Sequence, residues 1–308
     1  MGRFLLIGLA VIAVGLVGAG IWLHTPDRDR ADLEATYLRA PSDYRDIAGM
    51  RMHVRVEGPA DAPALVLIHG FGASLHTWDD WAADLSRDHR VVRFDLPGHG
   101  LTGPDPSGDY TLERTAAVLG EVLDTLRIDR ATLVGSSLGG LTAWMYAADN
   151  PGRVDRLVLL APGGFPLAGQ AYGQPSPVPP AFKTMRHVLP ESGVKASFAP
   201  LYGDPSRLDA ETVRRYWDML RAPGVRQALV DRLEDFVLRD PTGRLAAITA
   251  PTLLMWGERD IMVPPAHAAR FADALPNETL VTYPDLGHMP MEEDPARTLK
   301  DLRAFLAR

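Results

Sequence analysis

The sequence contains no cysteine, and that absence removes several kinds of chemistry. Disulfide bonds, thiolate metal sites, iron–sulfur ligation and a cysteine nucleophile are excluded, as is a lipid anchor on a modified cysteine. An excess of positive charge is also absent, because 39 acidic residues outnumber 32 basic ones and the formal net charge is −7. Phosphate binding needs clustered positive charge, so we expect no broad nucleic-acid-binding role.

The rest of the composition is that of a folded globular protein. The 308 residues are 46% hydrophobic and 23% charged, which leaves ample apolar surface for a packed core. These values exclude a mainly disordered chain, a collagen-like repeat and a coiled coil. The length allows one large domain or two small ones.

One long apolar run stands near the amino terminus. Phe4–Leu23 is free of charge, and a helix of about 20 residues reaches ~30 Å, the thickness of the hydrocarbon core of a bilayer. We therefore predict a transmembrane anchor within residues 1–24, with the lipid bilayer as partner and the folded remainder of the chain outside the cytoplasm. The alternative is a secretory signal cleaved near residues 17–19, which would release the protein in secreted form.

Strand-like runs alternate with amphipathic helical patterns after residues 25–45, which are expected to form a polar linker or a short helix at Arg30–Arg39. Several runs are continuously apolar, as expected for strands buried on both faces of a parallel sheet. The alternation predicts an α/β fold with a doubly wound, mostly parallel sheet. The strand-like runs are Met52–Val56, Leu65–His69, Val91–Asp95, Thr132–Gly135, Leu157–Ala161, Thr252–Gly257 and Leu280–Tyr283.

This alternation breaks between residues 163 and 245. The stretch opens with two glycines and a proline-rich loop, and continues with helix-like patterns at Ala210–Leu220 and Val225–Leu238. Its length and helical bias predict a helical cap. The cap would be inserted between two parts of the α/β core, residues 46–162 and 246–308.

The sharpest motif is a G-x-S-x-G pattern centred on Ser137, directly after a predicted strand and before a predicted helix. A nucleophile on such a strained strand-to-helix turn needs small residues two positions before and after it, and Gly135 and Gly139 meet that need. Its hydroxyl would then stand clear of the sheet at the positive end of the following helix. Ser137 is therefore the candidate nucleophile. A Gly/Ser turn or a helix N-cap is the structural alternative.

A serine hydroxyl needs a base, and the base needs a group that orients it. Asp260 and His288 follow the last two predicted strands, and loops after successive parallel strands emerge at the same sheet edge as the serine. The order Ser, Asp, His is the one that accompanies a nucleophile elbow. Glu258 and an acid near Asp235 or Asp240 are alternatives to Asp260.

Hydrolysis of an acyl group also needs donors for the developing oxyanion. The motif His69-Gly70-Phe71-Gly72 ends an early strand, and we expect the backbone N–H groups of Phe71 and Leu138 to supply these donors. The two glycines allow the backbone to approach the substrate closely. His69 and His99 are interpreted as structural hydrogen-bonding groups, because no second base is required. The turn Asp95–Gly100 is expected to brace the oxyanion loop.

Residues 47–306 resemble the α/β-hydrolase superfamily, on the four ordered motifs H-G-F-G, D-x-P-G-x-G, G-x-S-x-G and G-H-x-P. The resemblance to its serine esterase and lipase-like members implies a cap over the active site and a two-step mechanism. In it Ser137 attacks a carbonyl, His288 moves the proton and Asp260 holds the imidazole, with small-molecule or lipid esters as substrates. No metal and no organic cofactor is implied.

Other functions remain open beside ester hydrolysis. Carbon–carbon bond hydrolases of aromatic degradation keep the serine, but they usually have asparagine before it and tryptophan after the histidine, where this chain has Ser136 and Met289. A membrane-associated lipid acyl hydrolase or acyltransferase is a second alternative, suggested by the anchor. A non-catalytic binding module on the same fold is a third.

Overall fold

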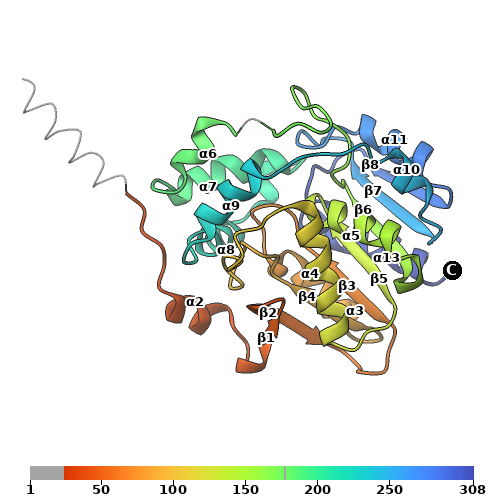
Figure 1. Ribbon diagram of the computed structural model, residues 1–308, viewed down its shortest axis with the longest axis horizontal. Coiled ribbons are helices and arrows are strands. Elements are labelled where there is room, and N and C mark those ends of the chain that lie inside the picture. The colour runs from red at the N-terminus through yellow and green to blue at the C-terminus, as the bar shows by residue number, and fades with distance from the viewer. Residues whose placement is uncertain (1–23, 177) are drawn as a thin grey trace, which may run out of the picture.

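A computed structural model describes residues 24–176 and 178–308 (Figure 1). The predicted membrane segment Phe4–Leu23 lies outside the described residues. Within the described ranges, no helix combines the length and apolar character that crossing a bilayer requires.

The described chain is built on an eight-stranded sheet that is mostly parallel, as the sequence predicted (Figure 1). The strand order is β1-β2-β4-β3-β5-β6-β7-β8. The β1–β2 and β2–β4 pairs are antiparallel, and the other neighbours are parallel. The parallel strands therefore end at one common edge. The strands are β1 (Tyr44–Ile47), β2 (Met50–Glu57), β3 (Ala64–Ile68), β4 (Arg90–Phe94), β5 (Ala131–Ser136), β6 (Val154–Leu160), β7 (Thr252–Gly257) and β8 (Glu278–Tyr283).

The central strands are buried on both faces, which explains their continuously apolar sequences. Along β3 and β5, Val66 and Leu133 belong to one core, while Leu65 and Val134 belong to the other. The first core is covered by α4 (Leu112–Thr125), α5 (Leu138–Asp149) and α11 (Ala266–Ala274). The second is covered by α3 (Asp79–Leu85) and α13 (Pro295–Leu306). Short helices complete the core: η1 (Pro41–Asp43), η2 (Leu75–Trp78), η3 (Pro151–Arg153) and α12 (Pro290–Glu293).

Between β6 and β7 the chain leaves the sheet and forms a series of short helices (Figure 1). The predicted helix Ala210–Leu220 is present as α8, and the one predicted to begin at Val225 is α9, which ends at Glu234. Buried side chains of this insertion, such as Val194 and Met219, share a core with strands β3 and β5. The helices are α6 (Pro180–Thr184), α7 (Glu191–Phe198), η4 (Ala199–Leu201), η5 (Pro205–Arg207), α8, α9 (Val225–Glu234) and α10 (Thr242–Ala246).

The sequence predicts a polar linker or a short helix within residues 25–45. The helix is present as α2 (Arg30–Tyr37), where Asp29 caps the amino end by accepting from Ala31 N, and β1 begins at Tyr44. Residues 24–30, here called the N-terminal strap, are bonded to the insertion. Arg226, for example, donates to Asp27 Oδ1 at 2.6 Å. Contacts between residues so far apart in sequence leave no periodic pattern from which they could be predicted.

Candidate active site

Ser137 occupies the sharp turn between β5 and α5. Its backbone angles are φ 53° and ψ −114°, in a region that residues with a side chain rarely adopt. Ser137 N donates to Leu160 O, and Ser137 O accepts from Leu141 N and Gly163 N, so the surrounding structure holds the strained residue in place. The side chain is half-buried among fully buried neighbours. The strained turn expected around position 137 is therefore present.

The two glycines that flank the serine allow backbones to approach where no side chain would fit. A Cβ at Gly135 would lie 2.3 Å from Gly139 O, and a Cβ at Gly139 would lie 2.1 Å from Ile68 O. Both distances are far below any real Cβ contact. The strand and the helix thus approach each other closely at this turn, as the sequence predicted, and only glycine fits at these two positions.

Asp260 and His288 meet at the same edge of the sheet, one on the loop after β7 and the other on the loop after β8. Asp260 Oδ2 lies 2.7 Å from His288 Nδ1, and both residues are buried, with 5% and 3% of their surfaces exposed. Asp260 Oδ1 accepts from the N–H groups of Met262 and Val263 at 2.8 and 2.9 Å, which fixes the plane of the carboxylate. Because Nδ1 is committed to Asp260, Nε2 is the ring nitrogen left for a reaction partner.

The alternatives to Asp260 make other contacts. Glu258 accepts from Thr282 Oγ1 at 2.8 Å, Asp235 accepts from Tyr110 N, and Asp240 accepts from Thr242 N and Oγ1. Only Asp260 reaches the histidine among the acids considered from the sequence.

Ser137 and His288 line the same pocket. Within the described part of the chain, Ser137 Oγ makes no hydrogen bond, to His288 or to another group. Catalytic hydrogen bonds are often long in ligand-free structures and tighten when substrate binds. Asp260 and His288 are thus in direct contact, whereas Ser137 and His288 are related by lining the same cavity.

The predicted oxyanion donors lie on either side of the serine. Leu138 is the first residue of α5, and Phe71 and Gly70 line the pocket with Ser137. A Cβ at Gly70 would lie 3.2 Å from Ser137 Cβ, so the loop passes directly beside the serine. In the described chain, neither the Phe71 N–H nor the Leu138 N–H donates to a protein acceptor. Both amides are therefore available to a ligand oxygen.

His69 is a structural residue, as the sequence interpretation held. Its Nδ1 donates to Gly70 O at 2.8 Å and its Nε2 accepts from Leu96 N at 2.9 Å, which ties the oxyanion loop to the loop after β4. Burial lowers the pKa of His69, which favours the neutral ring. Burial likewise places the pKa of His99 well below its usual value.

Asp95 holds the base of the oxyanion loop. It accepts from Leu75 N, Leu101 N and His53 Nδ1 at 2.7 to 2.8 Å. Burial would raise the pKa of Asp95, but the charge and hydrogen bond of His53 outweigh it and lower that pKa. The turn Asp95–Gly100 thus braces the loop that carries Phe71.

Glu293 is a positioning residue that the sequence analysis did not identify. Its carboxylate accepts from Gly287 N at 2.8 Å, Gly203 N at 3.0 Å and Asp204 N at 2.8 Å. It therefore fastens the loop that bears His288 to the cap. Glu293 follows His288 by five residues, and this position just after the G-H-M-P motif is the one feature of the sequence that could have pointed to it.

Arg232 and Glu292, also missed, are buried charges that join the cap to the core. Arg232 on α9 donates to Pro97 O, Tyr110 O and Thr115 Oγ1, and burial lowers its pKa to about 10. Glu292 accepts from Tyr202, Tyr216 and Arg215, and burial raises its pKa. These contacts fix the cap over the site.

The pocket itself is a largely apolar cavity of about 510 Å³ between the sheet edge and the cap. Pockets of this size hold drug-sized ligands. Besides Ser137, His288 and Arg232, its polar side chains are Gln170, Ser176 and Ser197. Cap residues 182–201 form one wall of it. A ligand here would contact mainly hydrocarbon, with its reactive group at Ser137.

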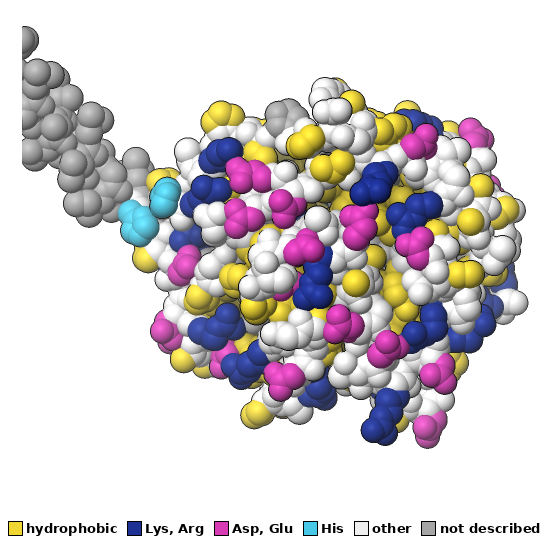
Figure 2. All heavy atoms as spheres, in the orientation of Figure 1, with side chains coloured by type: hydrophobic (Ala, Val, Ile, Leu, Met, Phe, Trp, Pro, Cys, Tyr) yellow, Lys and Arg dark blue, Asp and Glu magenta, His cyan; other side chains and the backbone are white. Residues whose placement is uncertain are grey.

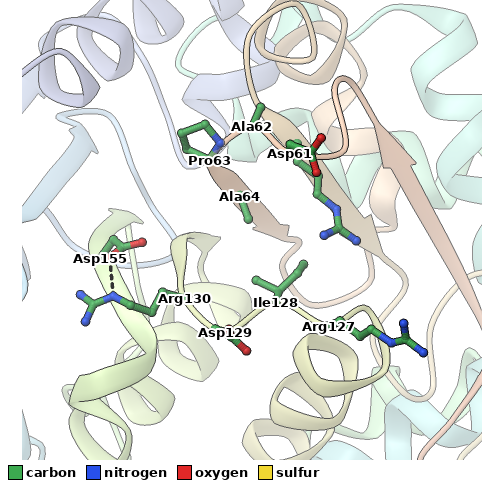
Figure 3. Close-up of a pocket in the computed structure, with 10 residues that line it drawn as sticks. Asp61, Ala62, Pro63, Ala64, Arg127, Ile128, Asp129, Arg130 and Asp155 are labelled. Atoms are coloured by element: carbon green, nitrogen blue, oxygen red, sulfur yellow. Dashed lines mark hydrogen bonds and ion pairs between the residues drawn. The ribbon is translucent and has the colours of Figure 1, made fainter.

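A second hollow lies at the opposite edge of the sheet, where β3, β5 and β6 begin (Figure 3). It is lined by charged side chains of both signs, and Arg130 pairs there with Asp155 at 2.6 Å. No serine or histidine lines it. It is separate from the site around Ser137.

The comparisons with known proteins agree with this architecture. A model of the family described as alpha/beta hydrolase fold matches residues 63–295. The chain belongs to this family. The α/β hydrolase chain is 32% identical over 269 residues to a Variovorax paradoxus protein named as the carbamate hydrolase RutD, with 84% of this chain and 97% of the relative covered.

Two further relatives lie at similar distance from this α/β hydrolase. It is 31% identical over 283 residues to a 2-hydroxy-6-oxononadienedioate/2-hydroxy-6-oxononatrienedioate hydrolase of Burkholderia vietnamiensis, covering 84% of this chain and 92% of the relative. The crystal structure of a hydrolase from Pseudomonas aeruginosa matches with a TM-score of 0.74 at 28% identity, covering 86% of this chain and 98% of that one.

Proposed function

We propose that the protein is a serine hydrolase that cleaves carboxylic esters through an acyl-enzyme intermediate. The observation that carries the proposal is the contact of Asp260 with His288, whose imidazole lines the same apolar pocket as a serine on a strained turn. That constellation is the one by which a serine hydroxyl becomes nucleophilic at neutral pH.

The proposed reaction follows from the positions of the polar groups. The Ser137 oxygen attacks the ester carbonyl while His288 Nε2 takes its proton, and Asp260 stabilises the imidazolium that forms. The N–H groups of Phe71 and Leu138 hold the negative oxygen of the tetrahedral intermediate. His288 then gives its proton to the leaving alcohol. Water attacks the acyl-enzyme in a second, equivalent round, and the serine is regenerated.

The carbon–carbon bond hydrolase remains the second candidate, because the likeness to the Burkholderia vietnamiensis enzyme favours it. Ser136 and Met289 argue against it, since that group usually has asparagine and tryptophan there. Both reactions use water to release an acyl group from the serine, so the substrate distinguishes them.

We also propose that Phe4–Leu23 anchors the protein in a membrane with the hydrolase outside the cytoplasm. The proposal rests on the length and apolar character of that run in the sequence. Release of a secreted protein by cleavage near residues 17–19 is the alternative.

Hydrolysis of p-nitrophenyl esters of increasing acyl length tests the enzymatic proposal. The purified protein is expected to turn over such esters, and Ser137→Ala to lose at least ~10³-fold of kcat/KM. 2-Hydroxy-6-oxononadienedioate, the compound in the name of the Burkholderia vietnamiensis relative, is the comparison. Absence of ester turnover by folded protein, with cleavage of this compound, would favour the second candidate.

A further inference from the structure

The N-terminal strap is fastened to the wall of the pocket at the point where the apolar run ends. Thr25 N donates to His187 O at 2.7 Å, and Leu189 N donates to Thr25 Oγ1 at 3.0 Å. Leu189 and the neighbouring Val188 line the pocket. Only His24 separates Thr25 from the end of Phe4–Leu23. A bilayer that held this run would therefore lie next to the cap wall, because one residue spans only about 3.8 Å.

Further contacts make the strap a rigid support. Asp27 accepts from Arg226 at 2.6 Å and from Gly224 N at 3.0 Å, and Arg226 is 4% exposed. Arg28 pairs with Asp218, which is 1% exposed and also accepts from Tyr37 at 2.8 Å. Each ion pair has one buried partner, Arg226 or Asp218, and removing the partner at the surface would leave that buried charge uncompensated. These contacts fasten residues 25–28 to the cap.

The surface beside the strap suits the boundary of a bilayer. The α6–α7 segment (residues 180–198) exposes 40% of Phe182, a side chain that also lines the pocket. Lys183 and Lys195 are exposed on the same segment, and Lys183 pairs with Glu234 at 2.9 Å. Apolar groups beside positive charge are the composition that binds the headgroup region of anionic membranes. Figure 2 shows histidine side chains where the described chain begins, with basic, acidic and apolar groups mixed over the adjoining cap.

We infer that the α6–α7 face of the cap docks on the lipid bilayer and that the pocket takes its substrate from the membrane. The substrate class is then an acyl ester dissolved in the bilayer, whose hydrocarbon chain passes from lipid into an apolar cavity of about 510 Å³ without crossing water. This inference rests on the proposed ester hydrolysis and on the membrane anchor.

The absence of cysteine makes a direct test of orientation possible, because a single introduced cysteine carries a fluorophore at one known position. The full chain is incorporated into phosphatidylglycerol–phosphatidylethanolamine vesicles that contain a lipid with a nitroxide-labelled headgroup. Labels on His187→Cys and Lys195→Cys are expected to lose fluorescence to the nitroxide. A label on Gly152→Cys, exposed at the opposite edge of the sheet, is the matched control and is expected to keep its fluorescence.

A change in the length of the tether tests the supply of substrate. A Gly/Ser insertion of about 20 residues between Leu23 and His24 adds a mean reach of about 25 Å. We expect it to weaken quenching at position 187 and to lower fatty-acid release from the vesicles about fivefold or more. Hydrolysis of soluble p-nitrophenyl butyrate is expected to stay unchanged. The same insertion after Gly152 is expected to change none of these values.

The outcomes separate the inference from the proposed function. Equal quenching at positions 152, 187 and 195, or unchanged lipid release after the insertion at residue 23, would overturn the bilayer-facing pocket while butyrate turnover continued. Recovery of the chain from cells as a soluble product cut near residue 19 would overturn it as well. Loss of butyrate turnover in the parent protein would instead contradict the hydrolase assignment, whatever the quenching showed.

Discussion

Asp260 and His288 come from loops after adjacent parallel strands, and the 2.7 Å contact between Oδ2 and Nδ1 leaves Nε2 as the free nitrogen of the imidazole. The two N–H groups that bind Asp260 Oδ1 prevent the carboxylate from rotating. The histidine is held from the other side as well, because His288 N donates to Leu201 O of the cap at 2.6 Å. The imidazole is therefore oriented by the sheet and the cap together.

Replacement of Asp260 by asparagine tests this orientation. The amide preserves shape, but it cannot stabilise an imidazolium and favours the wrong tautomer of the ring. We expect kcat for p-nitrophenyl butyrate to fall about 10⁴-fold, as in the serine-triad variant of this kind, with little change in KM. Glu258→Gln on the same loop is the control and should keep kcat within about threefold. Equal losses in the two variants would remove Asp260 from its role.

The turn at Ser137 makes a prediction about stability. A methyl group at Gly139 would lie 2.1 Å from Ile68 O, a backbone atom that cannot move without shifting β3. We expect Gly139→Ala to lower the free energy of unfolding by about 3 kcal/mol or more, measured by urea denaturation. Gly152→Ala is the matched control. Its added methyl meets no atom within 4 Å, so we expect a change within about 0.5 kcal/mol.

Glu293 should affect both stability and rate. Glu293→Gln turns an amide N–H₂ toward backbone donors that the carboxylate now accepts, and hydrogen bonds to charged groups contribute about 1.5–3 kcal/mol each. We expect the free energy of unfolding to fall by about 2 kcal/mol and kcat to fall about tenfold, because the loop bearing His288 loosens.

The exposed Glu278→Gln on β8 is the control for this pair of measurements. It should leave kcat, KM and the free energy of unfolding unchanged. A Glu293→Gln protein that lost stability but retained its kcat would show that Glu293 supports the fold without positioning the histidine.

The stability of the protein should decrease in mild acid. Burial lowers the pKa of His76 to about 3, whereas histidine in an unfolded chain titrates near 6.5. Between these values the unfolded state binds a proton that the folded state does not, so the free energy of unfolding falls as pH drops below about 6.5. One such group contributes a slope of about 1.4 kcal/mol per pH unit. The lowered pKa values of His69 and His99 act in the same direction.

Urea unfolding at pH 6, 5 and 4 measures this slope. His76→Gln is expected to reduce it by about 1.4 kcal/mol per pH unit, the share of one proton. His187→Gln, at an exposed position, serves as the control and should leave the slope as it is. A slope that did not differ between His76→Gln and the parent protein would show that His76 charges without unfolding.

The sequence predicted the sheet and the residues at the edge where its parallel strands end, because constraints between neighbouring residues determine both. Strands buried on both faces must be continuously apolar, as in Ala64–Ile68, and a turn such as that at Ser137 requires glycine at positions 135 and 139. Each of these constraints involves only a few neighbouring residues. The same is true of the motif that ends at His288.

The strap and the positioning residues could not be predicted in this way. Asp27 pairs with the buried Arg226 across 199 positions of sequence, and nothing near either residue specifies the other. Glu293 bonds to backbone N–H groups, which every residue but proline possesses, so its partners are set by tertiary packing alone. A polar stretch after an apolar run is therefore predicted as a linker, although the N-terminal strap is hydrogen-bonded to the cap.

Labelling with a fluorophosphonate probe, followed by mass-spectrometric mapping of the modified residue, tests the central claim most directly. The probe reacts only with a serine that a neighbouring base activates, and it needs no knowledge of the substrate. We predict a single adduct on Ser137, lost in Ser137→Ala and strongly slowed in His288→Ala. Folded protein that remained unlabelled, or that carried the adduct on another serine, would contradict the account.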